Sequence, residues 1–191
     1  MSGQPAGRVA AIPAWVRYGA IAGVFAFGCT LGVNLVFIWL QPADLCRTGP
    51  LIIPLLMLTA LAVFLALAVA AGFATGRVSG PGSSAALAGL LVGVLGGCAL
   101  LALIPFAPSV GQRIKDLTAL CPGGVLFGSA PPPGALQPPP PEAVGPPTGA
   151  AAVFNAVVMI TIGTGLAVGA AALAGLLGVA TRPGAGADRQ R

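Results

Sequence analysis

The stretch AALAGLLVGVLGGCALLALIPF, which runs from Ala85 to Phe106, has no charged residue at any of its 22 positions. About 20 consecutive apolar residues are enough to carry an α-helix across the roughly 30 Å hydrocarbon core of a bilayer. Inside that core each backbone amide and carbonyl needs a partner from the protein, and a helix supplies all of them from one segment. The stretch therefore predicts a transmembrane helix.

Three further apolar runs resemble this one in length, which predicts spans at about 15–40, 51–76, 85–106 and 150–180. Of the 191 residues, 57% are hydrophobic and 7% are charged, whereas a soluble domain carries about 25% charged residues. No strand-like alternation of apolar and polar residues interrupts the runs. We therefore expect an all-α, integral membrane four-helix bundle. It forms one transmembrane domain over 15–184, between an N-terminal segment 1–14 and a tail 185–191.

Basic residues are unequally distributed between the two sides that four spans create. Both termini fall on one side, together with six arginines: Arg8, Arg17, Arg77, Arg182, Arg189 and Arg191. The opposite side holds Arg47, Arg113 and Lys115. Cytoplasmic loops carry the excess of Lys and Arg. The distribution predicts a multi-pass protein of the cell membrane with cytoplasmic N and C termini.

The two outer connections differ in length. The first, 41–50, is short and predicts a helical hairpin. The second contains a Pro-rich outer loop at 125–149, in which nine of the seventeen residues from 131 to 147 are proline. Such a segment has little to bury and favours a polyproline II or disordered spacer. A recognition arm is the alternative interpretation.

The two halves of the chain share short motifs in the same order. The first half contains AIAG (20–23), GCTL (28–31) and MLT (57–59), and the second contains ALAG (86–89), GCAL (97–100) and MIT (159–161). This order favours a tandem duplication of a two-helix hairpin. Because each copy has two spans, both insert with the same orientation, which predicts a parallel pseudo-repeat about an axis along the membrane normal.

Four cysteines form two pairs under this alignment. Cys46 and Cys121 both fall on the outer side, where an oxidising compartment favours a disulfide between the two hairpins. A redox-active pair and two free thiols are the alternatives, although no Cys-x-x-Cys motif is present. Cys29 and Cys98 lie inside spans, where cysteine behaves as a small hydrophobic residue.

Small residues recur four positions apart on several spans, so that they share one helical face and permit close approach of a neighbouring backbone. The expected helix-packing residues are Gly19, Gly23, Gly28, Gly32, Gly89, Gly93, Gly97, Gly165 and Gly169, with a further pair at Gly72 and Gly76. They serve either packing within the bundle or contact with helices of other membrane proteins, including self-association.

Chemistry-bearing residues are scarce. The chain has no histidine, and Arg17, near the end of its span, is the charged residue inside an apolar run. Transport pathways usually contain an intramembrane charge. We expect Asn34, Asn155 and the membrane threonines to hydrogen-bond between helices. We expect no catalytic, cofactor-binding or metal-binding residues, and scattered basic residues do not indicate nucleic-acid binding.

These patterns favour a non-enzymatic accessory or assembly subunit, which acts by helix–helix contacts in a membrane complex and is surrounded by the lipid bilayer. One alternative is a small pore or carrier for a neutral or lipidic solute, lined by Thr and Asn. A second alternative is a thiol–disulfide redox protein that uses Cys46 and Cys121.

The cysteine pattern makes a testable prediction. In oxidised membranes, Cys46 and Cys121 are expected to resist alkylation by a maleimide reagent until a reductant is added, because a disulfide consumes both thiols. Labelling is followed by a gel shift, with Cys46→Ser and Cys121→Ser as single controls that each free one thiol. Four freely labelled cysteines without reductant would refute the bridge.

Overall fold

The computed structural model describes residues 12–39, 42–80, 82–106, 108–109, 112 and 149–181, with side chains of the second segment described from Leu55 onward. Its elements are α1 (Ala14–Trp39), α2 (Pro42–Ser79), α3 (Gly82–Ala102), the short 3-10 helix η1 (Ile104–Phe106) and α5 (Gly149–Ala180). Each of the four long helices contains a segment long and apolar enough to cross a membrane: Ala14–Val36, Leu55–Ser79, Gly82–Phe106 and Ala152–Ala180. For the described residues, this confirms the expectation of an all-helical chain with four helices long and apolar enough to span a membrane.

The connection between α2 and α3 is shorter than the turn expected at 77–84. Helix α2 continues to Ser79, and Gly80 then adopts a positive φ of 87°. Its amide donates to the carbonyl of Gly76 at 3.1 Å, which satisfies a free carbonyl at the helix end. Glycine suits this left-handed position because it has no Cβ. Helix α3 begins at Gly82, immediately after Pro81.

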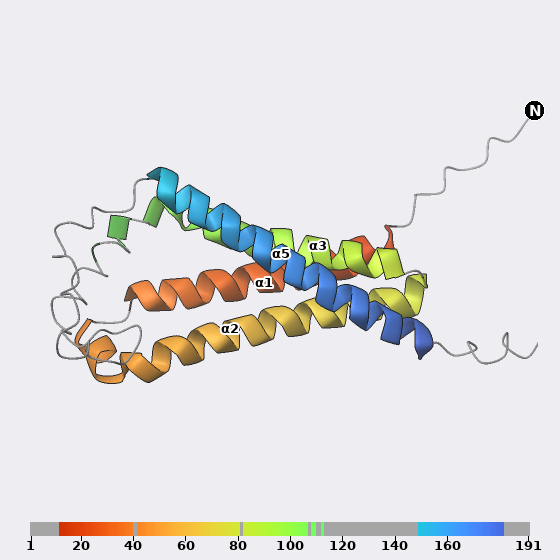
Figure 1. Ribbon diagram of the computed structural model, residues 1–191, viewed down its shortest axis with the longest axis horizontal. Helices are drawn as coiled ribbons and strands as arrows, with labels where there is room; N and C mark the ends of the chain where they lie inside the picture. Colours follow the sequence, from red (N-terminus) through yellow and green to blue (C-terminus); the bar gives the residue numbers. More distant parts are fainter. Residues whose placement is uncertain are drawn as a thin grey trace, which may run out of the picture.

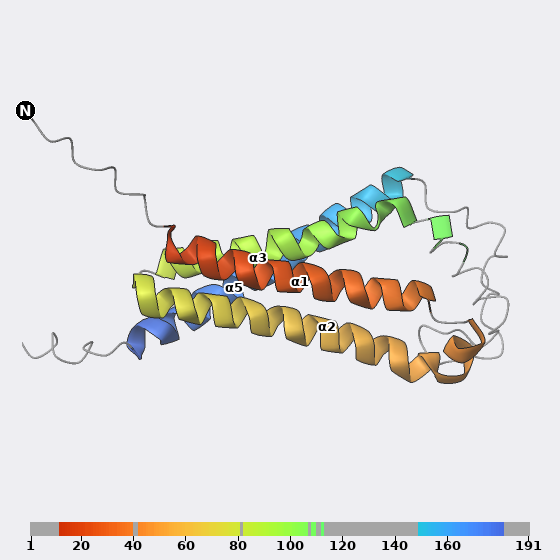
Figure 2. The same cartoon turned by 180° about the vertical axis from the view of Figure 1, so that it is seen from behind.

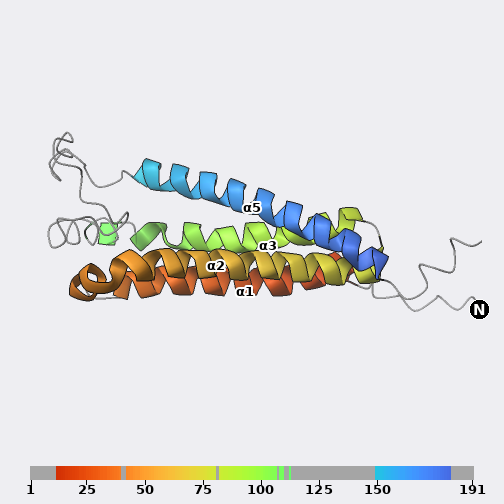
Figure 3. The same cartoon turned by 60° about the horizontal axis from the view of Figure 1, so that its bottom comes forward.

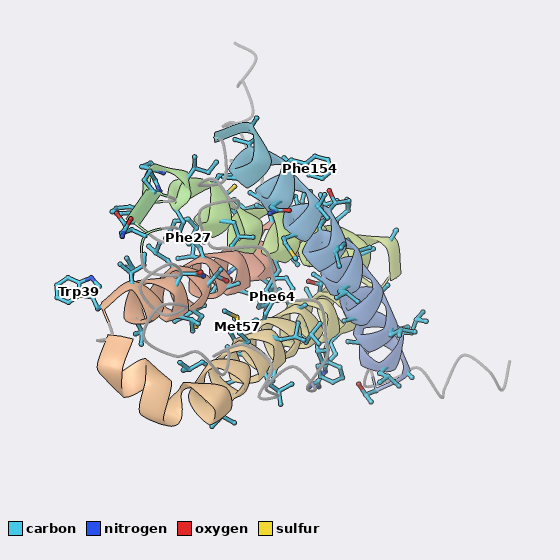
Figure 4. The ribbon with its side chains drawn as sticks, turned by 60° about the vertical axis from the view of Figure 1, so that its left-hand side comes forward. Phe27, Trp39, Met57, Phe64 and Phe154 are labelled. Atoms are coloured by element: carbon cyan, nitrogen blue, oxygen red, sulfur yellow. The ribbon has the colours of Figure 1, made fainter. Side chains whose placement is uncertain are left out.

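The first outer connection differs from the expected loop. Helix α2 begins at Pro42, so residues 42–50 are helical rather than irregular. Proline suits a first helical position because the amide it lacks would have no partner there. These first turns bend away from the straight part of α2 (Figures 2 and 4). Pro50 and Pro54 lie in this part of the helix, and internal prolines remove a backbone hydrogen bond and kink helices.

The four long helices form a bundle in which α1 and α5 are diagonal partners. Helix α1 packs on α2 and α3, helix α5 packs on α2 and α3, and α2 also contacts α3. Helix α1 begins and α5 ends at one end of the bundle, here called the terminal end (Figure 1). The opposite end, where α1 ends and α2 and α5 begin, is called the loop end. A strict twofold axis between the hairpins α1–α2 and α3–α5 would place α5 relative to α1 as α2 lies relative to α3. Helix α2 contacts α3, whereas α1 and α5 are diagonal, so the bundle departs from that symmetry.

The tightest packing lies toward the terminal end. The buried cluster there consists almost entirely of alanines, together with Val92: Ala22, Ala26, Ala68, Ala71, Ala88 and Ala167. Helices α2 and α5 meet at this end and diverge toward the loop end (Figures 1 and 3). Of the nine residues from 55 to 63 of α2, none is buried. The bundle is therefore closed at one end and open at the other.

Candidate helix-packing sites

Helix α3 is the central helix of the bundle. Of its apolar span, 39% is buried, against 17% for the spans of α2 and α5. One face carries Gly89, Gly93 and Gly97 at four-residue spacing, and all three lie against α5. A Cβ added to Gly89 would lie 2.5 Å from the carbonyl oxygen of Ala167. The two backbones are thus so close that only glycine fits at this position.

Gly93 and Gly97 extend the same contact along α5. A Cβ on Gly93 would lie 2.5 Å from the Cα of Thr164. A Cβ on Gly97 would lie 2.8 Å from Cγ1 of Ile160. The contact at Gly97 is to a side chain, which can shift, whereas the contacts at Gly89 and Gly93 include backbone atoms, which cannot shift without moving the helix.

Gly19 and Gly23 of α1 contact the other side of α3. A Cβ at Gly19 would lie 3.0 Å from the carbonyl oxygen of Ala88. A Cβ at Gly23 would lie 2.6 Å from Cδ1 of Leu95. At this contact the glycines belong to α1, whereas α3 presents Ala88, Leu91 and Leu95. Helix α3 therefore packs closely on both α1 and α5.

Helices α2 and α5 meet at the terminal end through small residues of both. Gly72 lies against the backbone of Ala171, and Gly76 lies against the backbone of Gly175. A Cβ on Gly178 would lie 2.5 Å from the carbonyl oxygen of Phe73. Gly175 and Gly178 were not singled out in the sequence, although the spacing from Ala171 to Gly175 is a further small-residue pair that indicates such a contact.

Four of the expected packing glycines have open surroundings. Gly28 and Gly32 of α1, and Gly165 and Gly169 of α5, are exposed and have no heavy atom within 4 Å of an added Cβ. The same spacing therefore has two uses in this chain. Some pairs join helices within the bundle, and two pairs face outward.

Phe64 of α2 occupies the centre of the bundle. Its ring lies 3.0 Å from the position of a Cβ on Gly96 of α3 and 4.0 Å from that on Gly163 of α5. Seen from the loop end, Phe64 lies among the helices, whereas Trp39 and Phe154 point away from them (Figure 4). Glycine at position 96 makes room for the ring. Sequence analysis missed this contact, because neither Phe64 nor Gly96 belongs to the repeated spacing that it singled out.

Polar side chains in the helices bond mainly to their own backbone, contrary to the expected contacts between helices. Thr59 donates to the carbonyl of Leu55 at 2.7 Å, and Asn34 donates to that of Thr30 at 2.8 Å. Two further threonines bond the carbonyl four residues earlier: Thr75 at 2.7 Å and Thr161 at 2.8 Å. A carbonyl one turn away is always within reach of a helical threonine, so no second helix is needed.

The hydroxyl of Thr164 differs from those of Thr59, Thr75 and Thr161. Its oxygen is buried and has no hydrogen-bond partner. It lies beside Gly93, at the tight contact between α3 and α5. A buried unpaired hydroxyl usually costs about 1–3 kcal/mol. The free energy gained by the close packing of α3 on α5 at this point therefore exceeds the cost of the unpaired hydroxyl.

Charged and sulfur-containing side chains do not form a chemical centre in the described part of the chain. The guanidinium carbon of Arg77 lies 5.9 Å from the ring centroid of Phe73, one turn earlier on α2. A cation at a helix C-terminus is favourable, and the ring adds a cation–π contact. Cys29 and Cys98 are free thiols, and no three metal-binding side chains gather among these residues. Cys121 and the side chain of Cys46 lie outside the described residues, so their disulfide stays a prediction.

Comparison with known proteins adds no relative. No protein-family model matches the chain, and no curated protein or solved structure matches it. Functional inference therefore rests on the geometry of the helices.

Replacing glycine by alanine is expected to have different effects at a packed position and at an exposed one. Gly89→Ala is expected to lower the free energy of unfolding by about 1–3 kcal/mol, because the new methyl group meets the α5 backbone. Gly165→Ala is expected to leave stability unchanged or to raise it by up to about 1 kcal/mol, because the methyl group meets open space and alanine favours helix. Unfolding by SDS titration in mixed micelles, followed by circular dichroism, measures both. Equal losses for the two variants would contradict the assignment of the faces.

Proposed function

We propose that the protein is a non-enzymatic accessory subunit of a membrane complex and acts through helix–helix contacts. The observation that carries the proposal is the pair of exposed glycine motifs on α1 and α5. Helices in lipid gain no hydrophobic free energy from association, so close van der Waals contact through small residues is a main source of affinity. Glycines that are already packed inside the bundle are unavailable for this role. The two exposed pairs are not packed against a helix of the bundle, so they can contact another one.

The α1 glycine face consists of Phe25, Gly28, Gly32 and Val36, which lie on one side of the helix by their three- and four-residue spacing. All four are exposed, with Phe25 at 63%. The two glycines form a flat centre, and the larger side chains flank it along the helix. This is the arrangement that allows a second helix to approach closely and to be held in one register.

The α5 glycine face consists of Ile162, Gly165, Gly169 and Leu173, all exposed. Helices α1 and α5 are diagonal in the bundle, so their outward faces point in different directions. One subunit therefore offers two separate surfaces. We propose that it joins two neighbouring helices, either from different partners or from two further copies of this chain.

The proposal includes a cell-membrane location with cytoplasmic termini and an origin by hairpin duplication. The arginine distribution supports the orientation. Matched positions of the repeat support the duplication, because Gly23 and Gly89 are both buried against a neighbouring helix, and Thr59 and Thr161 both bond the carbonyl one turn earlier. Departures from symmetry, such as open Gly28 against packed Gly97, fit divergence of the two copies after duplication.

The alternative of a pore lined by Thr and Asn receives less support. Thr59, Thr161 and Asn34 donate their hydrogen bonds to their own helices. Side chains committed in this way offer fewer donors to a passing solute. The thiol–disulfide alternative depends on Cys46 and Cys121 and stays open until those thiols are measured.

Co-purification tests the proposal. The chain is extracted from its native membranes in a mild detergent, and bound membrane proteins or further copies of the chain are identified by mass spectrometry and size-exclusion chromatography. Gly28→Leu with Gly32→Leu, or Gly165→Leu with Gly169→Leu, is expected to remove one bound helix each, because leucine keeps the partner backbone at a distance. The unfolding transition should not fall, since the added side chains meet open space.

A matched comparison uses α2. Ala66→Leu with Ala70→Leu adds side-chain volume at two exposed positions one turn apart, outside both glycine faces. This variant is expected to keep its partners. A wild-type chain recovered as a monomer without partners, or partners lost only in the α2 variant, would contradict the proposal.

A further inference from the structure

The side of α2 that packs on α5 at the terminal end is uncovered at the loop end. Positions 58, 61, 65, 72 and 76 share one helical face, because they are three, four or seven residues apart. Gly72 and Gly76 are buried against α5. Leu58 and Leu61, on the same face, are 64% and 45% exposed. Helix α5 thus leaves this face as the two helices diverge.

The face of α2 that points into the bundle shows the same change. Met57 lies on the face that also holds Phe64, Ala68 and Thr75. Ala68 and Thr75 are fully buried, whereas Met57 is 51% exposed. Figure 4, seen from the loop end, places Met57 and Phe64 on the inner side of α2. The inner face of α2 is therefore covered from Ala68 to Thr75 and half exposed at Met57, on the loop-end side of Phe64.

Helix α5 provides the opposite wall. Met159 lies one turn before Gly163, a residue of α5 that lies near the Phe64 ring, and therefore on the same side of the helix. Its side chain is 60% exposed. The two helices are apart on this side in two views (Figures 1 and 3). Phe64 marks the point at which α2 and α5 separate.

The segments of α2 and α5 on either side of this space offer few polar groups to a ligand. Neither 55–64 of α2 nor 152–163 of α5 contains an ionisable residue. The hydroxyls of Thr59 and Thr161, at the same level, already donate to carbonyls of Leu55 and Val157. A charged or strongly polar ligand would lose its hydration without replacement bonds. Asn155 is exposed one turn before Met159 and lies nearer the loop end. The deeper part of the space between the helices therefore favours an apolar occupant.

The size of the wall residues disfavours a third helix. Close helix contact in lipid needs small residues, and the side chains here are Leu58, Leu61, Met57 and Met159. Methionine side chains are flexible and fill irregular gaps, which suits contact with a thin flexible chain. The depth also fits, because the nine-residue rise from Leu55 to Phe64 is about 14 Å, close to half of the roughly 30 Å hydrocarbon core.

We propose that an acyl chain of a membrane phospholipid lies between α2 and α5 at the loop end and reaches the ring of Phe64. The chain enters from the leaflet at that end. It covers the apolar side chains of both walls and supports two helices that do not touch there. This inference does not depend on the accessory-subunit proposal, because the glycine faces lie on other surfaces.

Photolabelling tests the site directly. The full chain is reconstituted in phosphatidylcholine liposomes that contain phosphatidylcholine with a diazirine in its acyl chain. After irradiation, peptide mass spectrometry is expected to find labelling concentrated at 57–64 of α2 and 156–163 of α5. Exposed positions on the outer side of α3, such as Leu87 and Leu101, should be labelled less in proportion to their exposure. Labelling in simple proportion to exposure would overturn the proposal, as would a second protein chain cross-linked at these residues in place of lipid.

A space-filling variant provides a second measurement. Leu58→Trp with Met159→Trp is expected to abolish the excess labelling and to lower the phospholipid that remains bound after detergent washing, measured as phosphate per chain. Leu87→Trp with Leu101→Trp adds the same side chains on the outer side of α3 and should leave both readouts unchanged. Equal phospholipid retention in the two variants would overturn the proposal.

Discussion

Close approach of helix backbones at glycine and alanine is the interaction on which the bundle depends. Lipid tails are as apolar as the side chains they contact, so helices in a membrane associate by van der Waals contact rather than by removal of apolar surface from water. Gly89 and Gly93 bring α3 against α5, and Gly19 and Gly23 bring α1 against α3. The result is a core without large side chains, in which Val92 and Thr75 are the largest fully buried residues described.

Between α2 and α5 this interaction acts at the terminal end, and the two helices diverge toward the loop end. At the terminal end, Gly72 and Gly76 of α2 lie against small residues of α5. On the loop-end side of Phe64, the facing side chains are leucine and methionine. The same division between small and large residues separates the surfaces of the molecule by occupant. In the two proposals, exposed glycines accept another helix and exposed bulky side chains accept lipid.

Much of the fold could be predicted from the sequence, because uncharged runs of about 20 residues have few alternatives to a membrane-spanning helix. The start of α2 was missed, because Asp44, Arg47 and two prolines resemble a loop although Pro42 begins a helix there. The inward or outward direction of each glycine pair could not be predicted. Apolar residues surround each helix on all sides, so no hydrophobic face distinguishes Gly23 from Gly28, and only the neighbours supplied by the fold separate them.

The central claim is that α2 and α5 are joined at the terminal end and apart at the loop end. Pulsed electron–electron spin resonance on the full chain in liposomes measures this with two pairs of spin labels. One pair replaces Val78 and Leu177 at the terminal end, and the other replaces Leu55 and Phe154 at the loop end, all at exposed positions. The account predicts a short, narrow distance distribution for the first pair and a longer mean distance for the second. Equal mean distances, or a shorter one at the loop end, would contradict it.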